Sequence, residues 1–241
     1  MKIINIKSAI ASVVAASMLI GCAGNSPGQA SGPNSSVLIG SAIGALAGIA
    51  LGNNIGGRSK GRNKVIGAAA GAAIGGAIGY SISKQAKEVA GSLNTDVNND
   101  PNAALDPSND LIVSNTDRYV KIMFRDKMMF TTNSSVPTLS AQSKTAKVGA
   151  ILNKYPKTIV QVVGYTDSRG TYAYNKTLSE KRASNVGNTI LNSGIGNQVF
   201  SKGCSYDKPV APNTSAANMA LNRRVEIYLY PKAEYIVDVC R

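Results

Sequence analysis

A carboxylate and a guanidinium stand fifteen residues apart in the second half of the chain. Asp167 follows the β-branched run at 158–166, and Arg182 lies in the segment 174–192, which has helical periodicity. Ligands of α/β sheets commonly gather at the carboxyl ends of strands, so we expect both side chains to face one cleft. A carboxylate accepts hydrogen bonds from an ammonium group, and a planar guanidinium binds a carboxylate. The pair therefore predicts a site for a zwitterionic amino-acid head group, although the same spacing also fits a salt bridge between Asp167 and Arg182.

The predicted helix carries further polar side chains beside Arg182. Asn175, Ser179 and Arg182 are spaced at i, i+4 and i+7, so they form one stripe along one helical face. We expect this stripe to face the same cleft as Asp167.

The composition offers little for catalysis. The chain has no histidine, so a nucleophilic serine would lack its usual general base. The acids of this region form no recognisable pair of the kind that hydrolyses a glycan. Without histidine, and with only two cysteines after Cys22, we also expect no metal site and no cofactor. These features favour a binding protein over an enzyme.

Those two cysteines, Cys204 and Cys240, are candidates for a disulfide in an oxidising compartment, the alternative being two free thiols. A bridge that closes a loop of about 37 residues would stabilise the fold by roughly 4 kcal/mol in the chain-entropy model.

Residues 1–21 predict a lipoprotein signal peptide. Lys2 and Lys7 precede a short apolar core that ends in Leu-Ile-Gly-Cys at 19–22. This ending resembles the bacterial lipobox, which implies that Cys22 is acylated and becomes the first residue of the mature chain. Ala23 follows where an aspartate would favour the inner membrane, so the resemblance implies a lipid anchor in the outer membrane, facing the periplasm. An ordinary signal peptide with a chance cysteine is the alternative.

The chain is basic, and its charge limits the classes of partner that it is expected to bind. The formal net charge is +13, and it falls to +11 when Lys2 and Lys7 are removed with the leader. A basic protein suits a polyanion, but an exported one does not meet nucleic acid in bulk. We expect anionic lipid head groups or cell wall as partners and no nucleic acid, or else a basic surface that serves solubility alone.

A glycine-rich segment lies between the anchor and the predicted domain. After a flexible tether at 22–36, glycines recur every fourth residue within apolar sequence in two blocks. This spacing keeps glycines on one helical face, where two helix backbones approach closely. We predict a helical hairpin over 37–84, with residues 37–56 packed against 65–84, which resembles the glycine-zipper segments of bacterial surface antigens. A low-complexity segment without fixed structure is the alternative, and a membrane span, a position against the inner leaflet and self-association all remain open.

Composition separates the remaining chain into three parts. Residues 85–111 contain a run rich in Asn, Asp and Pro, which predicts a linker, and 233–241 form a carboxy-terminal tail. Between them, residues 112–232 predict an α/β domain in β-α-β-α-β-β order, with helices on one face of a mixed sheet. The expected strands and helices cover 117–125, 138–155, 158–166, 174–192, 198–203 and 223–230. The segment 234–240 is a possible further edge strand.

Several spaced motifs carry a family resemblance. "GYTD" at 164–167, "NKTLSEKRA" at 175–183 and "NRRVE" at 222–226 strongly resemble the OmpA-like peptidoglycan-binding domain. The match covers roughly residues 115–232, about half of the chain. Together with the lipobox and the glycine zipper, the whole resembles outer-membrane lipoproteins of the YiaD type.

The resemblance implies a fold, a ligand and a set of site residues. It implies an α+β sandwich that binds the diaminopimelate of peptidoglycan stem peptides. By motif position, Asp167 would bind the amino group and Arg182 the carboxylate. Thr166 and Asn175 would line the same pocket.

Two further residues match less secure positions. Asn133 lies in a loop that contributes to the family pocket, and Arg223 would reach the ligand or brace the site. The chain departs from the usual pattern at Thr131, where the family often has aspartate, and at Tyr165, where histidine is commoner.

These inferences lead to a non-enzymatic outer-membrane lipoprotein that ties the membrane to the cell wall. The alternative is a structural subunit of an envelope machine, such as a secretion system or motor. In that case the glycine zipper oligomerises and the same domain serves only as a wall anchor.

Overall fold

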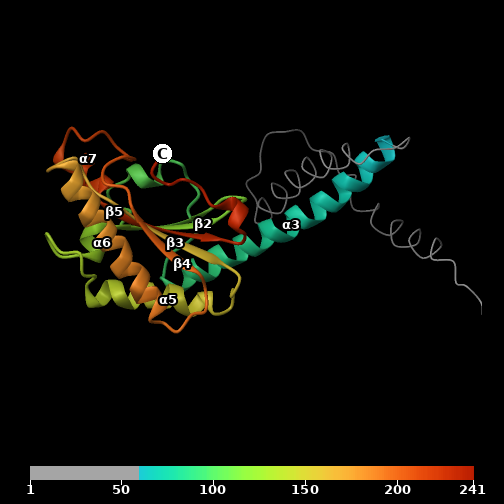
Figure 1. The fold of residues 1–241 in the computed structure, drawn as a ribbon, viewed down its shortest axis with the longest axis horizontal. Coiled ribbons are helices and arrows are strands. Elements are labelled where there is room, and N and C mark those ends of the chain that lie inside the picture. The colour runs from blue at the N-terminus through green and yellow to red at the C-terminus, as the bar shows by residue number, and fades with distance from the viewer. Residues whose placement is uncertain (1–59) are drawn as a thin grey trace, which may run out of the picture. The chain divides into compact units, whose positions relative to one another are not determined.

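The computed structural model describes residues 60–241, with side chains from residue 76 onward (Figure 1). The strands are β1 (Leu111–Asn115), β2 (Val120–Arg125), β3 (Ile159–Tyr165), β4 (Val199–Gly203) and β5 (Arg224–Tyr230). The helices are α3 (Lys60–Ser92), α4 (Asp126–Met129), α5 (Leu139–Leu152), α6 (Tyr172–Leu191) and α7 (Ala216–Asn222), with short 3-10 helices η2 (Ala103–Leu105) and η3 (Ala233–Tyr235).

The five strands form one mixed sheet. Their order is β1-β2-β5-β3-β4, and neighbours are antiparallel except β3 and β4, which are parallel. Ile227 of the central strand lies opposite Ile122 on one side and Val162 on the other. These three residues are fully buried in the main hydrophobic core. The predicted β-α-β-α-β-β order and mixed sheet are therefore confirmed, with β1 as an additional edge strand.

Helices α3, α5 and α6 cover one face of the sheet, as predicted for the two helices foreseen from the sequence (Figure 1). Both α5 and α6 begin at a threonine whose side chain caps the helix. Thr138 accepts a hydrogen bond from the backbone N–H of Ala141, and Thr171 accepts one from Tyr174. Their buried residues, such as Val148 and Val186, pack in the same core as the sheet.

The linker predicted over 85–111 is wrong in its first part. Helix α3 continues through Ser92, and Ala86, Val89, Ala90 and Leu93 are buried in the main core. Contacts with the domain fix it further, because Gln85 Nε2 donates to Thr158 Oγ1 at 3.1 Å. The domain therefore includes the end of α3, and its boundary lies well before residue 112.

The second part of that segment is also attached to the domain. Residues 94–110 follow an irregular path, but Val97 pairs with Val113 of β1, and the backbone N–H of Asn98 donates to the Val113 carbonyl at 2.8 Å. Asx side chains hold the turns, since Asp100 accepts from the backbone of Asn102 at 2.8 Å. The polar composition thus builds turns along the edge strand and does not produce a free linker.

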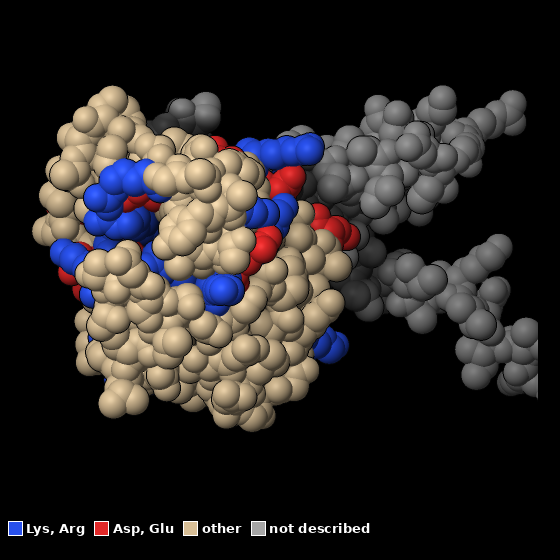
Figure 2. Space-filling view, turned by 60° about the vertical axis from the view of Figure 1, so that its left-hand side comes forward, with Lys and Arg blue, Asp and Glu red and all other residues tan. Residues whose placement is uncertain are grey.

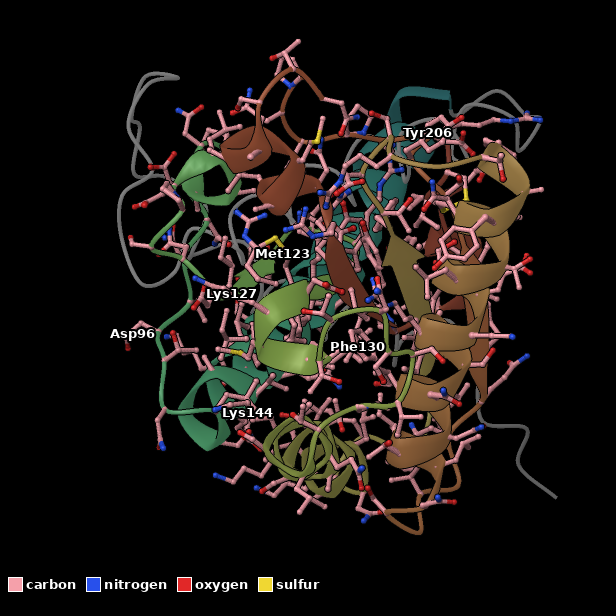
Figure 3. All side chains as sticks on the ribbon, turned by 90° about the vertical axis from the view of Figure 1, so that its left-hand side faces the viewer. Asp96, Met123, Lys127, Phe130, Lys144 and Tyr206 are labelled. Atoms are coloured by element: carbon pink, nitrogen blue, oxygen red, sulfur yellow. A yellow bond between two sulfur atoms is a disulfide. The ribbon has the colours of Figure 1, made fainter. Side chains whose placement is uncertain are left out.

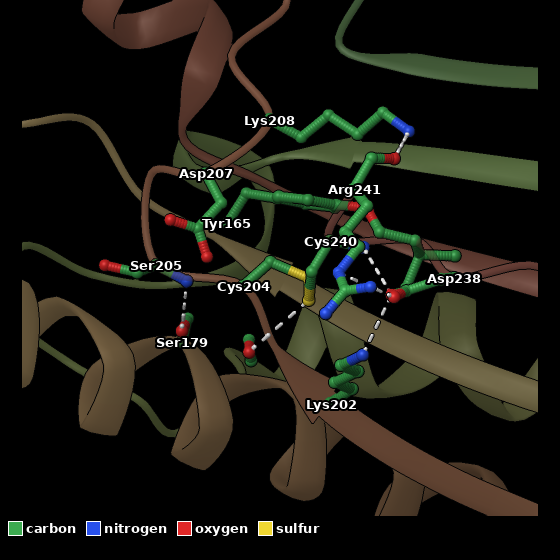
Figure 4. Close-up of a disulfide and its surroundings, with 12 residues drawn as sticks. Tyr165, Ser179, Lys202, Cys204, Ser205, Asp207, Lys208, Asp238, Cys240 and Arg241 are labelled. Carbon is green, nitrogen blue, oxygen red and sulfur yellow. Dashed lines mark hydrogen bonds and ion pairs between the residues drawn. A yellow bond between two sulfur atoms is a disulfide. The ribbon is translucent and has the colours of Figure 1, made fainter.

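The carboxy-terminal tail covers part of the other face of the sheet. The expected edge strand at 234–240 is wrong, because the segment contains η3 followed by non-regular backbone. Cys240 forms a disulfide with Cys204, 36 residues earlier in the sequence (Figure 4). Val239 is buried, and its carbonyl accepts a hydrogen bond from Tyr165 Oη at 2.9 Å. The tail is held to the sheet by a covalent bond and by packing.

The glycine-rich hairpin falls only partly within the described residues. Its first arm, 37–56, lies outside them, as do the signal peptide and the tether. Its second arm, 65–84, is helical and belongs to α3. Among the described residues, no helix combines the length and apolar character that a membrane crossing requires.

Candidate binding cleft

A cleft of about 860 Å³ opens where β2 and β3 end and α4 and α6 approach each other. Its walls come from the loops after β2 and β3, from one face of α6 and from the residue before β5. Figure 3 looks onto this end of the domain, where Phe130 lies between α4 and α6 and Lys127 lies farther out. Segments far apart in the sequence therefore combine to form one concave site.

All six residues expected to bind the ligand line this cleft. They are Asn133, Thr166, Asp167, Asn175, Arg182 and Arg223. Ser179 does not line it, because its hydroxyl accepts a hydrogen bond from the backbone N–H of Ser205 at 3.0 Å and donates to the Lys176 carbonyl at 2.9 Å. Ser179 instead joins α6 to the loop after β4.

Close packing of α6 on the sheet places Arg182 at the cleft. A Cβ atom at Gly164 would lie 2.2 Å from the Ser179 carbonyl oxygen, and one at Gly203 would lie 2.4 Å from the Glu180 backbone nitrogen. Both distances are far inside van der Waals contact. Glycine at these two positions thus allows α6 to lie directly against β3 and β4, as the backbone of a helix can do only where side chains are missing.

Asp167 is buried at the floor of the cleft, with 4% of the residue exposed. Its carboxylate accepts hydrogen bonds from the backbone N–H of Arg169 at 3.0 Å, from Arg169 Nη2 at 2.8 Å and from Arg223 Nη1 at 2.7 Å. Burial opposes ionisation of this group, but the hydrogen bonds from the two arginines outweigh it and lower the pKa of Asp167. The cleft therefore presents a fixed carboxylate.

Arg182 is equally buried, with 4% of the residue exposed, and its guanidinium is held on three sides. Nη1 lies 2.7 Å from Asp126 Oδ1, Nε donates to the Ser134 carbonyl at 3.0 Å, and the guanidinium carbon lies 4.7 Å from the centre of the Phe130 ring. The last contact is a cation–π interaction. Burial raises the pKa of Asp126, and this outweighs the opposing effects of Arg182 and Arg223.

The salt bridge between Asp167 and Arg182 that the spacing allowed does not form. Each residue has partners of its own, Asp167 with Arg169 and Arg223, and Arg182 with Asp126. Both still line the same cleft. The Asp167 carboxylate and the Arg182 guanidinium therefore both face the cleft and do not form an ion pair with each other.

The supporting residues divide by role. Thr166 is buried, and its hydroxyl has no hydrogen-bond partner within the described part of the chain. Asn175 donates from Nδ2 to the Arg169 carbonyl at 2.7 Å and so fixes the loop after Asp167. Asn133 adopts a left-handed conformation with φ of 59° in the loop after α4, a conformation that asparagine tolerates better than most residues.

Sequence reasoning missed three charged residues of the cleft, Asp126, Lys127 and Arg169, and two of them form ion pairs with the expected residues. Asp126 directly follows β2 and pairs with Arg182, and Arg169 folds back onto Asp167. The position of Asp126 after a strand end was a usable signal, since Asp167 was found by the same rule. Its pairing with a residue 56 positions later depends on the fold, which brings the start of α4 to α6.

The cleft carries an excess of positive charge. Lys127, Arg169, Arg182 and Arg223 line it, against two carboxylates, Asp126 and Asp167. Figure 2 shows basic side chains gathered around a hollow on one face of the molecule, with fewer acidic side chains among them. Such a site suits a ligand that has both signs of charge and an excess of carboxylate.

Comparison with known proteins identifies the domain. Residues 129–223 match the sequence profile of the OmpA family, and residues 1–83 match that of the YMGG-like Gly-zipper. The chain contains an OmpA-family domain. In structure, the chain is similar to a MotB-like protein from Desulfovibrio vulgaris, with a TM-score of 0.52 and 18% identity over 64% of this chain and 96% of that chain. At this identity the likeness shows that the fold is shared.

Two curated relatives are similar in sequence to part of this chain. "Probable lipoprotein YiaD" of Escherichia coli is 38% identical over 104 residues, which are 42% of this chain and 48% of that protein. The peptidoglycan-associated lipoprotein of Mesorhizobium japonicum is 33% identical over 101 residues, which are 41% of this chain and 60% of that protein. The chain therefore covers less than two thirds of the length of either relative.

Proposed function

We propose that this chain is a non-enzymatic outer-membrane lipoprotein whose OmpA-family domain binds peptidoglycan through the diaminopimelate of its stem peptides. One observation carries the proposal: the Asp167 carboxylate and the Arg182 guanidinium line the same cleft and are not paired with each other. The name of the Mesorhizobium japonicum relative, a peptidoglycan-associated lipoprotein, supports the same ligand. The acylated Cys22 and the glycine zipper would hold the domain at the membrane.

The two charged groups match the free end of a diamino acid. The ammonium group of diaminopimelate would donate to Asp167, and its carboxylate would accept from the planar fork of Arg182. The Thr166 hydroxyl, which is buried without a partner in the described residues, is available to the same head group. A zwitterion offers an ammonium group to Asp167 and a carboxylate to Arg182, whereas a neutral ligand offers neither, so the cleft favours a zwitterion.

A single cleft gives only modest affinity, and the polymer compensates for this. Hydrogen bonds to charged groups contribute roughly 1.5–3 kcal/mol each, and part of that gain replaces bonds already present in the cleft. Many copies anchored in one membrane and facing one continuous wall raise the effective concentration of sites. The membrane and the wall would thus be held together by many weak contacts.

Sedimentation with purified peptidoglycan tests the proposal. We expect Asp167→Ala and Arg182→Ala, each in the full-length chain in mild detergent, to abolish co-sedimentation with wall. Arg118→Ala and Asp238→Ala are matched controls, since both residues are exposed or partly exposed and lie outside the cleft, and these variants should bind like the wild type.

Circular dichroism and thermal unfolding must accompany the assay, because Arg182 also supports the fold through Asp126. Asp167→Asn, which keeps the shape of the side chain, provides a second variant if the alanine variants are unstable. Undiminished co-sedimentation of folded Asp167 and Arg182 variants would rule out the assigned site.

A further inference from the structure

The Asp167 carboxylate has no free acceptor position in the cleft. Oδ1 accepts from the Arg169 backbone N–H at 3.0 Å and from Arg169 Nε at 3.2 Å, while Oδ2 accepts from Arg169 Nη2 at 2.8 Å and from Arg223 Nη1 at 2.7 Å. A carboxylate offers about four lone-pair sites. An incoming ammonium group must therefore displace one of these donors before it can bind Asp167.

Arg169 is the donor that can leave. Its side chain is 67% exposed, whereas that of Arg223 is 29% exposed and lies between Asp126 and Asp167. The Arg169 backbone stays in place, since its N–H donates to Asp167 and its carbonyl accepts from Asn175 Nδ2 at 2.7 Å. Only the guanidinium has to move, and Asp167 keeps the backbone hydrogen bond when it does.

When it moves, the Arg169 guanidinium gives up its ion pair with Asp167. Four cationic and two anionic side chains line the cleft, and the two anions are already paired. A ligand with one ammonium and one carboxylate satisfies Asp167 and Arg182 but leaves the Arg169 guanidinium without a carboxylate. A second carboxylate on the same diamino acid would accept hydrogen bonds from the Arg169 guanidinium in place of Asp167.

We propose that Arg169 is a specificity-determining residue that selects ligands whose diamino acid carries a second free carboxylate. The inference rests on the proposed function, and there it distinguishes between wall peptides. A stem tripeptide that ends at the diamino acid has one ammonium and two carboxylates on that residue. A longer or amidated stem has lost one of these carboxylates to an amide.

Two soluble peptides test this selectivity. One is the stem tripeptide with a free terminal carboxylate, and the other is the same tripeptide with that carboxylate converted to a carboxamide. Isothermal titration of the full-length chain in mild detergent should show that the free acid binds about tenfold more tightly, as expected for one charge-assisted hydrogen-bond pair. In Arg169→Ala this preference should disappear, because no guanidinium is left to bind the second carboxylate.

The comparison separates this inference from the function on which it rests. Arg118→Ala, an exposed arginine outside the cleft, should keep the wild-type preference. An unchanged preference in Arg169→Ala, or an equal loss of affinity for both peptides, would overturn the role of Arg169 while leaving wall binding intact. If the wild-type chain binds neither peptide, the proposed function itself fails.

Discussion

Arg182 and Asp126 form a buried ion pair that joins α6 to α4, with Nη1 and Oδ1 2.7 Å apart and side chains that are 5% and 17% exposed. Removing one partner of such a pair leaves an uncompensated charge away from water. The pair therefore supports the wall of the cleft as well as the fold.

We expect Asp126→Asn to lower the free energy of unfolding by about 3 kcal/mol, because Arg182 then remains buried without a carboxylate. Urea denaturation measures this change. Asp238→Ala is the control: its pair with Lys202 is exposed by more than 40% on both sides, and such pairs contribute less than about 1 kcal/mol. Equal losses of unfolding free energy in the two variants would show that the buried pair stabilises the fold no more than the exposed pair does.

The pH dependence of stability should report on Asp167. Hydrogen bonds from Arg169 and Arg223 outweigh burial and lower the pKa of Asp167 in the folded chain below its unfolded value of about 3.9. The ionised group thus stabilises the fold above that pH, and its contribution is lost as the pH falls through the folded-state pKa. The difference in unfolding free energy between wild type and Asp167→Asn should be constant near neutrality and shrink below about pH 4. A difference that grows in acid would contradict the assignment.

The packing of α3 into the core gives a third prediction. Ile82 is 1% exposed and lies in the main core, so Ile82→Ala should lower the free energy of unfolding by about 2–5 kcal/mol. Tyr80 lies on the same helix and is 61% exposed, and Tyr80→Ala should change stability by less than about 0.5 kcal/mol. If Ile82→Ala were as neutral as Tyr80→Ala, α3 would not belong to the folded unit.

The disulfide between the tail and the sheet gives a fourth prediction. Reduction of the bridge between Cys204 and Cys240 should destabilise the domain by up to roughly 4 kcal/mol in the chain-entropy model. Thermal unfolding with and without reductant measures the shift. The double variant Cys204→Ser with Cys240→Ser should unfold at a lower temperature than the oxidised wild type and show no response to reductant. A wild type that ignores reductant would mean that packing of the tail alone holds it in place.

Sequence patterns predicted the elements whose signals are strong and local. The β-branched run of β3 and the helical period of α6 both lie where they were expected, because each pattern spans the whole element. Strand β1 was missed because its short apolar core, Leu111 to Val113, follows a long polar run rich in Asn and Asp. Within the segment 85–93, Ala and Lys gave no sign of burial, which arises only when α5 and the sheet pack against it.

The candidate cleft was also predictable in part, through the residues that the sequence pattern places at strand ends and on helix faces. Asp167 and Arg182 stood out because each lies at a recognisable place in the strand–helix pattern, and all six expected residues line the cleft. The partners Asp126 and Arg169 were not foreseen. One depends on contact between α4 and α6, and the other on a side chain turning back over its own loop. Neither relationship leaves a periodic trace in the sequence.

Helix α3 runs from Lys60 to Ser92 without interruption and ends inside the core of the OmpA-family domain. At about 1.5 Å per residue, its 33 residues measure about 50 Å. A continuous helix is a stiff connection. Tension on the domain would pass along the hydrogen-bonded backbone of α3 into the glycine-rich segment, without first extending a flexible linker.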